Sequence, residues 1–412
     1  MKTNPETAAF PLDHLAIGRD PDADALVTRS GTLSYKMLNH RIGVLAAWLQ
    51  DQGAAKGDRV ATWLAKTELA CLMPLAAARA GLVHVPVNPL LKQAQVAYIV
   101  EDSGARLLIS NAGRLKALAD SDIDDSCTLF EDKSVEEALA SVATPLVPSA
   151  ANVDTGDLAA ILYTSGSTGR PKGVMLSHAN LTLGALSVAE YLKLAADDRT
   201  ICVLPLSFDY GQNQLLSTWA AGGCAVPLDY LTPRDVMKAC ARERITTLAA
   251  VPPLWVQLVE HEWPEEAVGS MRRLTNSGGA LTPTLVRQLR AIFGPGTDIY
   301  AMYGLTEAFR STFLDPSAER FKNAPAASQY SGTAVFSGDT VKRGKDGLLY
   351  FVSRDDAMIK SSGNRISPTE IEEIAVESGM IAEAVALGVS DERLGQAIRL
   401  FVRPVEQGAE QA

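Results

Sequence analysis

The chain has few cysteines, and their spacing fits neither a cross-link nor a metal site. Five cysteines are scattered over 412 residues without a C-x-x-C pair. This pattern argues against a disulfide framework and against a zinc site. We expect all five to be small core residues: Cys71, Cys127, Cys202, Cys224 and Cys240.

The sequence also lacks a long uninterrupted apolar run. Its first residues contain a proline and an acid and lead into no apolar core of signal-peptide type, so we expect a cytoplasmic protein. The most apolar stretch, residues 69–87, is interrupted by Pro74, Arg79 and His84. Such a stretch is poorly suited to spanning a bilayer. It predicts a buried helix followed by a strand.

Basic side chains are in deficit. There are 38 Lys and Arg residues against 48 Asp and Glu residues, which gives a formal net charge of -10. This balance argues against nucleic acid as the main partner. Hydrophobic residues make up 47% and charged residues 21%, as in soluble globular proteins. The length suggests two or three structural units, one of them large and one small.

Helical and strand patterns alternate through most of the chain. Apolar residues recur at helical spacing between Leu33 and Gln52, and short apolar runs predict buried strands. The alternation predicts an α/β fold, in which doubly wound sheets covered by helices form a large N-terminal domain. The predicted strands span residues 59–64, 83–87, 105–109, 158–163, 200–204 and 247–251.

The periodicity weakens between Ala308 and Val335, where prolines and small polar residues suggest a surface segment or a boundary. Regular strand and helix patterns return after Val335. We expect strands at residues 347–352 and 384–389, and a capped helix with proline at its first position at residues 367–374. These elements predict a small α+β C-terminal domain.

A predicted strand runs into a loop rich in hydroxyls and glycine in Tyr163-Thr-Ser-Gly-Ser-Thr-Gly-Arg-Pro-Lys-Gly173. Glycine lets backbone N–H groups approach phosphate oxygens, the hydroxyls add donors, and Lys172 supplies positive charge. The common P-loop is excluded because two residues separate Gly169 from the lysine. A flexible turn before a helix that starts near Ser177 is the alternative, but the ordered string favours nucleotide binding.

This string resembles the phosphate-loop signature of the acyl-adenylate-forming superfamily, which includes acyl-CoA synthetases, luciferases and the adenylation domains of peptide synthetases. The segment Tyr303-Gly-Leu-Thr-Glu-Ala308 looks like the family's Y-G-x-T-E segment. The resemblance implies that Thr306 touches phosphate and that Glu307 holds magnesium, for which a carboxylate is a suitable ligand. Within this superfamily, the sequence most resembles the AMP-forming acyl-CoA synthetases of the fatty acid ligase type.

Further matches follow in the family's order. Asn276-Ser-Gly-Gly-Ala-Leu281 resembles the stretch along the adenine, although read alone it is only a turn. Ser337-Gly-Asp-Thr340 resembles the T-G-D segment, which implies that Asp339 bonds the ribose hydroxyls; a surface turn aspartate is the alternative. Arg354 is implied to reach the ribose as well.

The resemblance thus implies catalytic roles for Lys172, Thr306 and Glu307. The implied ATP- and AMP-binding residues are Thr164, Ser165, Gly166, Ser167, Thr168, Gly169, Gly278, Gly279, Ala280, Tyr303, Gly304, Thr306, Asp339 and Arg354.

Residues 353–372 resemble the hinge and first hairpin of the family's mobile C-terminal domain. The implied division is an AMP-binding (adenylation) domain at residues 1–355 and a partial mobile domain at residues 356–412. Ala357 stands where the family has its hinge acid, and Gly363 is implied to lie near the thiol channel in the thioester-forming pose. An ordinary solvated charge run is the alternative.

Two family parts have no counterpart in this sequence. Glu307 and Asp339 lie so close together that the family's small β-rich subdomain is predicted to be missing near residue 316. The sequence ends before the G-K motif whose lysine contacts the substrate carboxylate and the α-phosphate, so we expect a shortened C-terminal domain. Two hypotheses follow: a working ligase, with full or impaired activity, or a degenerate relative that binds nucleotide without catalysis.

Three positions bear on the acid. The family's acetyl enzymes carry tryptophan where this chain has Gly304, so the resemblance implies room for a medium- or long-chain acyl group. Phe208 replaces a histidine of many acyl-CoA ligases, which makes Tyr210 a candidate wall of the acyl pocket. Either aromatic could equally be plain core.

The implied reaction is the ATP-dependent activation of a carboxylic acid to acyl-AMP, followed by transfer to CoA with release of AMP and pyrophosphate. ATP, Mg²⁺ and CoA as co-substrate are therefore expected, and an acyl carrier protein is the alternative acceptor. His178 could serve as a base, but a satisfied role near the start of a helix is the favoured interpretation.

Overall fold

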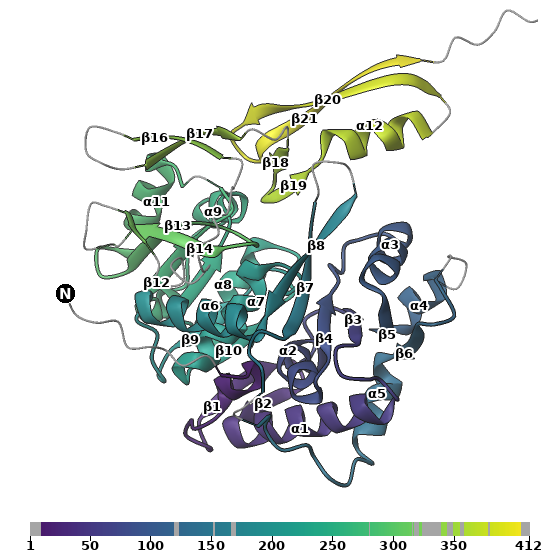
Figure 1. The fold of residues 1–412 in the computed structure, drawn as a ribbon. Coiled ribbons are helices and arrows are strands. Elements are labelled where there is room, and N and C mark those ends of the chain that lie inside the picture. The colour runs from purple at the N-terminus through teal and green to yellow at the C-terminus, as the bar shows by residue number, and fades with distance from the viewer. Residues whose placement is uncertain are drawn as a thin grey trace, which may run out of the picture.

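The computed structural model describes residues 10–118, 123–150, 153–165, 170–279, 281–314, 316, 321–323, 339–343, 349–354, 358–377 and 380–404. Its strands form two large sheets, one four-stranded sheet and one two-stranded sheet. Helices cover the large sheets, so the predicted α/β class is confirmed (Figure 1). Among the described helices, none has both the length and the apolar character needed to cross a membrane.

The largest sheet has nine strands in the order β15-β14-β13-β12-β11-β9-β10-β1-β2. Six neighbouring strands, β1, β10, β9, β11, β12 and β13, run parallel to one another. Strand β2 pairs antiparallel with β1 at one end, and β14 and β15 continue antiparallel beyond β13 at the other. The strands span Asp24–Thr28 (β1), Gly31–Ser34 (β2), Arg199–Cys202 (β9), Cys224–Pro227 (β10), Thr247–Ala250 (β11), Arg273–Asn276 (β12), Asp298–Leu305 (β13), Phe309–Leu314 (β14) and Phe321–Asn323 (β15).

The second large sheet has six strands in the order β6-β5-β3-β4-β7-β8. It is parallel except for its last pair, β7 and β8, which form an antiparallel hairpin. Its strands span Arg59–Trp63 (β3), Val83–Pro86 (β4), Ala105–Ser110 (β5), Thr128–Glu131 (β6), Leu158–Ser165 (β7) and Pro171–Ser177 (β8). The six strands predicted from the sequence are therefore all present, but they divide between two sheets.

A pair of helices joins the two large sheets. Helix α6 (His178–Tyr191) contacts β7 and β8, α7 (Asp209–Ala221) contacts β9 and β10, and the two helices contact each other. One hydrophobic cluster runs through both helices into α1 (Tyr35–Asp51) and α2 (Glu68–Ala80). The remaining helices are η1 (Leu12–Ala16), α3 (Gln93–Ser103), α4 (Ala112–Leu118), α5 (Asp132–Leu139), α8 (Pro233–Arg242), α9 (Pro252–Val259), α10 (Glu265–Ser270), α11 (Pro283–Phe293) and α12 (Pro368–Glu377).

Local sequence explains where these helices begin and end. The Ser177 hydroxyl accepts the backbone N–H of Asn180, and the Asn180 side chain accepts the N–H of Ser177, which forms a capping box at the start of α6. Helix α2 begins after Thr67, whose hydroxyl caps it, and ends at Gly81 in the left-handed conformation. Both ends of these helices are thus fixed by their own residues.

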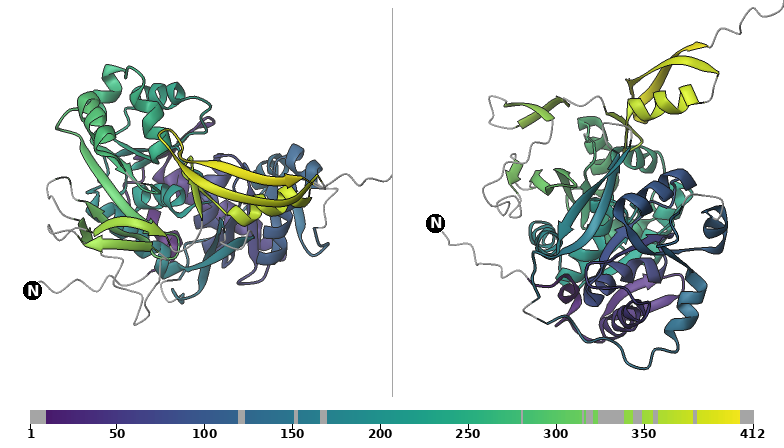
Figure 2. Two further views of the ribbon diagram at one scale, coloured as in Figure 1. Left: turned by 90° about the horizontal axis from the view of Figure 1, so that it is seen from above. Right: turned by 45° about the vertical axis from the view of Figure 1, so that its right-hand side comes forward.

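The last described elements form a small layer of their own. The strands β18 (Ile359–Ser361), β19 (Asn364–Ile366), β20 (Ile381–Asp391) and β21 (Gly395–Pro404) make the four-stranded sheet, and α12 packs on β20. Figure 2 shows this layer, in yellow, over one side of the larger part. The two-stranded sheet comprises β16 (Asp339–Arg343) and β17 (Leu349–Arg354). A domain boundary at residue 356 stays a prediction.

One expectation about the fold is wrong in part. Between Ala308 and Val335 a surface segment or a boundary is predicted, but residues 309–314 and 321–323 form β14 and β15, which extend the nine-stranded sheet. The Phe313 ring is buried and stacks on Tyr191 with centroids 4.3 Å apart. The packing of Phe313 on α6 therefore favours a strand here, although the apolar periodicity of the segment is weak.

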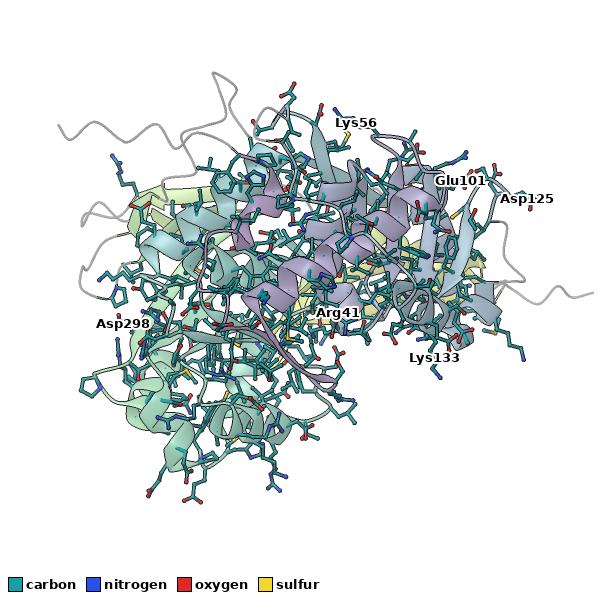
Figure 3. The ribbon with its side chains drawn as sticks, turned by 90° about the horizontal axis from the view of Figure 1, so that it is seen from below. Arg41, Lys56, Glu101, Asp125, Lys133 and Asp298 are labelled. Atoms are coloured by element: carbon teal, nitrogen blue, oxygen red, sulfur yellow. The ribbon has the colours of Figure 1, made fainter. Side chains whose placement is uncertain are left out.

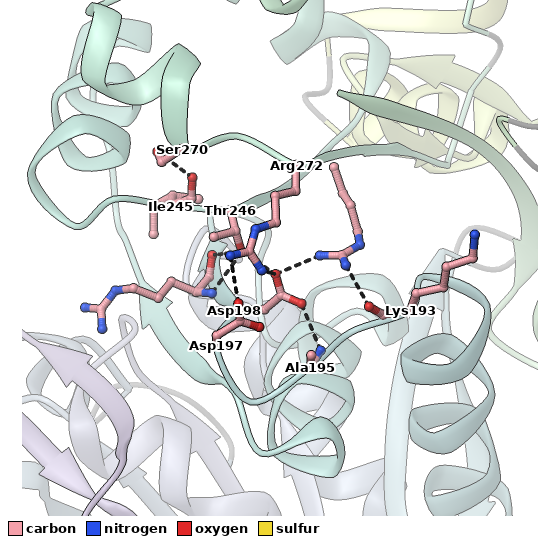
Figure 4. Close-up of polar contacts among 10 residues, drawn as sticks. Lys193, Ala195, Asp197, Asp198, Ile245, Thr246, Ser270 and Arg272 are labelled. Atoms are coloured by element: carbon pink, nitrogen blue, oxygen red, sulfur yellow. Dashed lines mark hydrogen bonds and ion pairs between the residues drawn. The ribbon is translucent and has the colours of Figure 1, made fainter. Parts of the chain in front are cut away.

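A buried carboxylate holds the amino ends of three parallel strands together. Asp198, which is 1% exposed, accepts hydrogen bonds from Thr246 Oγ1 at 2.8 Å and Arg273 Nη1 at 2.7 Å (Figure 4). It also accepts the backbone N–H of Ala195 at 2.8 Å and Arg272 Nη1 at 3.3 Å. These donors precede or begin β9, β11 and β12, so the carboxylate fixes where the three strands start.

We expect Asp198→Ala to lower the free energy of unfolding by about 3–5 kcal/mol, because two arginines would lose a buried partner. Urea unfolding followed by tryptophan fluorescence measures this change. The matched control is Asp197→Ala, since Asp197 bonds Arg272 at 2.8 Å from an exposed position. That variant should lose no more than about 1 kcal/mol. Equal losses in the two variants would contradict the role given to Asp198.

Candidate active site

The carboxyl ends of the parallel strands β9, β11, β12 and β13 lie together along one side of the nine-stranded sheet, which is called the sheet edge below. In open α/β sheets, ligands bind in the crevice outside the carboxyl ends of the strands. The segments that leave this edge are residues 203–208, Val251, residues 277–279 and the turn at residues 306–308. Two of the motifs found in the sequence therefore converge here from different strands.

The glycine segment, Asn276 to Gly279 at the end of β12, is held by a hydrogen bond and by close packing. Asn276 Nδ2 donates to the Gly279 carbonyl oxygen at 2.9 Å. Gly278 has φ +79°, and a Cβ there would lie 3.4 Å from Val251. A Cβ on Gly279 would lie 3.0 Å from Pro252. The two glycines thus allow close packing on Val251 and Pro252. The adenine assignment stays a prediction, and Ala280 lies outside the described residues.

The Y-G-L-T-E segment closes the hairpin between β13 and β14. Tyr303 and Gly304 lie just before Leu305, the last residue of β13, and Thr306 and Glu307 form the turn, with Glu307 exposed. The register shifts between Tyr303, which faces Thr312, and Gly304, which faces Arg310. Such a bulge re-aims side chains at the edge of a sheet. The turn therefore presents a carboxylate at the edge of the candidate site.

The phosphate-loop motif forms the hairpin of β7 and β8. Lys172 is exposed and lies opposite Thr164, while Ser165 ends β7 opposite Pro171. Gly173 lies opposite Tyr163, and a Cβ on Gly173 would be 2.7 Å from Ile161 Cγ2. The motif's last glycine is thus required for packing across the hairpin. The predicted residues Gly166, Ser167, Thr168 and Gly169 lie outside the described part of the chain.

The two predicted ribose contacts are brought together by the β16–β17 hairpin. Asp339 and Arg354 are Cα partners in this hairpin although they are far apart in the sequence. One ligand could therefore meet both positions.

Gly363 lies against the same valine as the glycine segment. It has φ +78° in the turn between β18 and β19, and a Cβ there would be 2.9 Å from Val251 Cγ2. The Val251 side chain therefore touches both Gly278 and Gly363. Strand β19 also contacts β7. The turn of the small sheet thus reaches both large sheets; the predicted hinge residue Ala357 lies outside the described residues.

A hydrogen bond and an ion pair join the small layer to the larger part. Gln95 Nε2 donates to Glu370 Oε1 at 3.0 Å, and Arg393 lies 3.7 Å from Glu260. Arg393 and Glu260 are both exposed, so this pair contributes little to stability. The exposed ion pair is therefore a weak link between the two layers.

A small pocket lies between α6, α7 and the nine-stranded sheet, and Tyr210 is one of its walls. The Tyr210 hydroxyl and Thr275 Oγ1 are 2.8 Å apart, and either can be the donor. Thr275 lies one residue before the glycine segment and Met302 one residue before Tyr303, so the pocket adjoins the candidate nucleotide site. Its described lining is Val188, Leu192, Leu194, Thr200, Tyr210, Asn213, Gln214, Ser217, Thr247, Ala249, Thr275 and Met302.

Neither of the other two predicted acyl-pocket residues belongs to this described lining. Phe208 is the N-cap residue of α7 and is half-buried, while Gly304 follows Met302 by two residues. The assignment of Phe208 and Gly304 to the acid therefore stays a prediction.

The sequence analysis missed the polar side chains of the pocket. Thr200, Asn213, Gln214 and Thr247 are at most 5% exposed. A signal was present in α7, where three consecutive amides, Gln212 to Gln214, interrupt an otherwise buried helix. Amides in such a setting ordinarily need partners.

His178 has a structural role. Its Nδ1 accepts the backbone N–H of Leu12 at 3.1 Å, at the start of α6. Burial lowers the pKa of His178 and favours the neutral ring that this hydrogen bond needs. The favoured interpretation, a satisfied histidine near the start of a helix, is confirmed.

Comparison with known families agrees with these motifs. A model described as "AMP-binding enzyme" matches residues 14–341, which is most of the chain. The chain belongs to this family. The match runs from η1 to β16 and includes the phosphate hairpin, the glycine segment and the Tyr303–Glu307 segment.

Two relatives illustrate the range of acids and acceptors in the family. Feruloyl-CoA synthase of Amycolatopsis sp is 30% identical over 439 residues, which cover 94% of this chain and 86% of that protein. An L-proline–[L-prolyl-carrier protein] ligase of Pseudomonas fluorescens is 27% identical over 427 residues, which cover 91% and 85%. Among solved structures, o-succinylbenzoate CoA synthetase of Bacillus subtilis matches with a TM-score of 0.81 at 22% identity, over 97% of this chain and 90% of that one. This last likeness supports the fold.

Gly211 sets the approach of α7 to the segment before it. A Cβ on Gly211 would lie 1.9 Å from the backbone carbonyl oxygen of Pro205. We expect Gly211→Ala to destabilise the protein by about 3 kcal/mol or more in urea unfolding, because the clash involves backbone. The control is Gly269→Ala in α10, where a Cβ meets nothing within 4 Å and alanine favours the helix. Unchanged stability of Gly211→Ala would show that this contact is not tight.

Proposed function

We propose that this AMP-binding family member activates a carboxylic acid with ATP and transfers the acyl group to CoA. The carboxylate attacks the α-phosphate, which gives acyl-AMP and pyrophosphate. The CoA thiol then attacks the acyl carbonyl, and AMP leaves as acyl-CoA forms. The observation that carries the proposal is that the glycine segment, the Tyr303–Glu307 segment and a small pocket adjoin one another at the carboxyl ends of the parallel strands.

Positioning and charge account for the first step in this proposal. Lys172 and the hydroxyls of the β7–β8 hairpin bind the phosphates, and Thr306, in the turn after β13, adds a hydrogen-bond donor. Glu307 fits Mg²⁺, because this ion keeps several waters and needs only one or two protein carboxylates beside the phosphates. Bound there, the ion would neutralise phosphate charge. Asp339 and Arg354 bind the ribose, and Gly278 and Gly279 lie along the adenine.

The second step is assigned to the small layer. Gly363 lines the route of the thiol, which is supported by its contact with Val251 beside the glycine segment. Gly363 packs closely on Val251 in this arrangement, so we assign the thiol route to the gap that opens when the small layer moves between adenylation and thioester formation.

The acid proposed from the sequence is a medium- or long-chain acyl substrate. The glycine at position 304 suggests room for this acid, and the apolar pocket residues Val188, Leu192 and Met302 support an apolar body for it. A carrier protein is the second candidate acceptor, favoured by the likeness to the L-prolyl-carrier protein ligase. Thioester formation on CoA compared with formation on a loaded carrier protein separates the two.

Isotope exchange between pyrophosphate and ATP over a panel of aliphatic and aromatic acids tests the first step. Acid-dependent exchange is the expected result, and CoA should then convert the adenylate to a thioester. AMP binding without exchange for any acid would instead indicate a nucleotide-binding protein that has lost catalysis.

We expect Lys172→Ala to lower the exchange rate by about 10²-fold, because a cation at the reacting phosphates is lost. The fold should be intact, since the Lys172 side chain is exposed. Lys133→Ala serves as the control; Lys133 lies on α5, beyond the opposite edge of the six-stranded sheet, and points to solvent (Figure 3). Full exchange activity in Lys172→Ala would remove this lysine from the mechanism.

We expect Gly363→Ala to slow thioester formation at least about tenfold while pyrophosphate exchange is retained. The new Cβ would press on Val251 and close the proposed thiol route. Gly294→Ala controls for backbone strain, because Gly294 has φ +73° and a Cβ there meets nothing within 4 Å. If both half-reactions slow equally in Gly363→Ala, the glycine has no special role in the thiol step.

A further inference from the structure

The floor of the pocket carries hydrogen-bonding atoms that no described residue satisfies. Thr200 and Thr247 each leave Oγ1 without a partner in the described structure, Asn213 leaves Nδ2, and Gln214 leaves both Nε2 and Oε1. All four side chains line the pocket and are 2–5% exposed. Native proteins pair most buried polar atoms, so one cluster of such atoms around a single pocket indicates a ligand group.

These four residues come from three elements that the fold holds rigidly. Thr200 and Thr247 are Cα partners on the adjacent parallel strands β9 and β11, within two residues of the Asp198 hydrogen bonds. Asn213 and Gln214 lie on α7, which packs on β9. Their arrangement is thus preorganised.

Thr200 and Thr247 lie near the amino ends of β9 and β11, so they line the end of the pocket away from the glycine segment. Thr275 lines the end of the pocket nearest the glycine segment. Thr247 on β11 pairs with Arg273 on β12, so Thr275 lies two residues farther along the strands than Thr247. At roughly 3.3 Å per residue, the floor is about 7 Å below Thr275. The carboxyl end of a bound acid belongs at the other end, beside the glycine segment, so the polar floor meets the far end of the acid.

The lining also specifies the kind of group. None of the twelve described lining residues carries a formal charge, which disfavours a second carboxylate or an ammonium group at the floor. Threonine hydroxyls and amides offer both donors and acceptors. A neutral group that donates and accepts, such as a hydroxyl, a phenol or a carboxamide, satisfies them.

We propose that the preferred acid has an apolar body and a neutral hydrogen-bonding group at its far end, bound by Thr200, Asn213, Gln214 and Thr247. This inference rests on the proposed function and narrows the acid named there. A wholly apolar acid would leave the polar atoms buried and unpaired, which costs about 10- to 100-fold in binding for each unsatisfied group.

Matched acids test the proposal on the full-length protein. The pairs are 3-(4-hydroxyphenyl)propionate with 3-phenylpropionate, and 8-hydroxyoctanoate with octanoate. We expect the hydroxylated member of at least one pair to show kcat/KM for pyrophosphate exchange at least about tenfold higher. Equal or higher values for the apolar member of both pairs would overturn the proposal.

Calorimetric binding of the same acids in the presence of AMP separates this proposal from the proposed function. If no acid supports exchange but a hydroxylated acid binds at least tenfold more tightly than its apolar partner, the proposed function fails and the inference stands. Absence of binding by all four acids would overturn the inference as well.

Variants locate the preference in the pocket. We expect the double substitution Thr247→Val with Gln214→Leu to abolish or reverse the preference, since both replacements keep the approximate volume and remove polar atoms. Thr218→Val is the matched control, because Thr218 Oγ1 is also buried without a partner in the described structure but does not line the pocket. A preference that survives the double substitution, or disappears in the control, would contradict the assignment.

Discussion

The hydrogen bonds of Asp198 determine where the parallel strands of the nine-stranded sheet begin. Because the carboxylate accepts from Thr246 and from Arg273, strands β9, β11 and β12 share one level at their amino ends. Their carboxyl ends then form an even edge from which the segments of the candidate site leave. The same register places Thr200 beside Thr247 at the floor of the pocket. A buried ion pair far from the chemistry thus sets the dimensions of the site.

Val251 connects this sheet edge to the small layer. Its side chain touches Gly278 on one side and Gly363 on the other, and both glycines have φ near +80°. Larger residues at either glycine would meet both a strained backbone and the valine. The proposed nucleotide and thiol sites therefore share one wall.

Local patterns predicted most of the fold and part of the candidate site. The six predicted strands of the large sheets are present, since apolar runs between turn residues carry strong local signals. Their division between two sheets depends on long-range pairing and on packing of α6 and α7, which no short window encodes. The nucleotide motifs are contiguous and could be found, and Tyr210 lines the pocket, while its role toward the acid stays a prediction. The floor could not be predicted, because Thr200, Gln214 and Thr247 meet only through the fold.

The central claim is that one crevice holds the nucleotide at the strand ends and the far end of the acid at the polar floor. A crystal structure with a non-hydrolysable acyl-sulfamoyl adenosine carrying a terminal hydroxyl tests it most directly. We predict the adenine against Gly278 and Gly279, and the terminal hydroxyl within hydrogen-bonding distance of Gln214 or Thr247. An acyl group that lies outside the pocket, with an adenine bound elsewhere, would contradict the account.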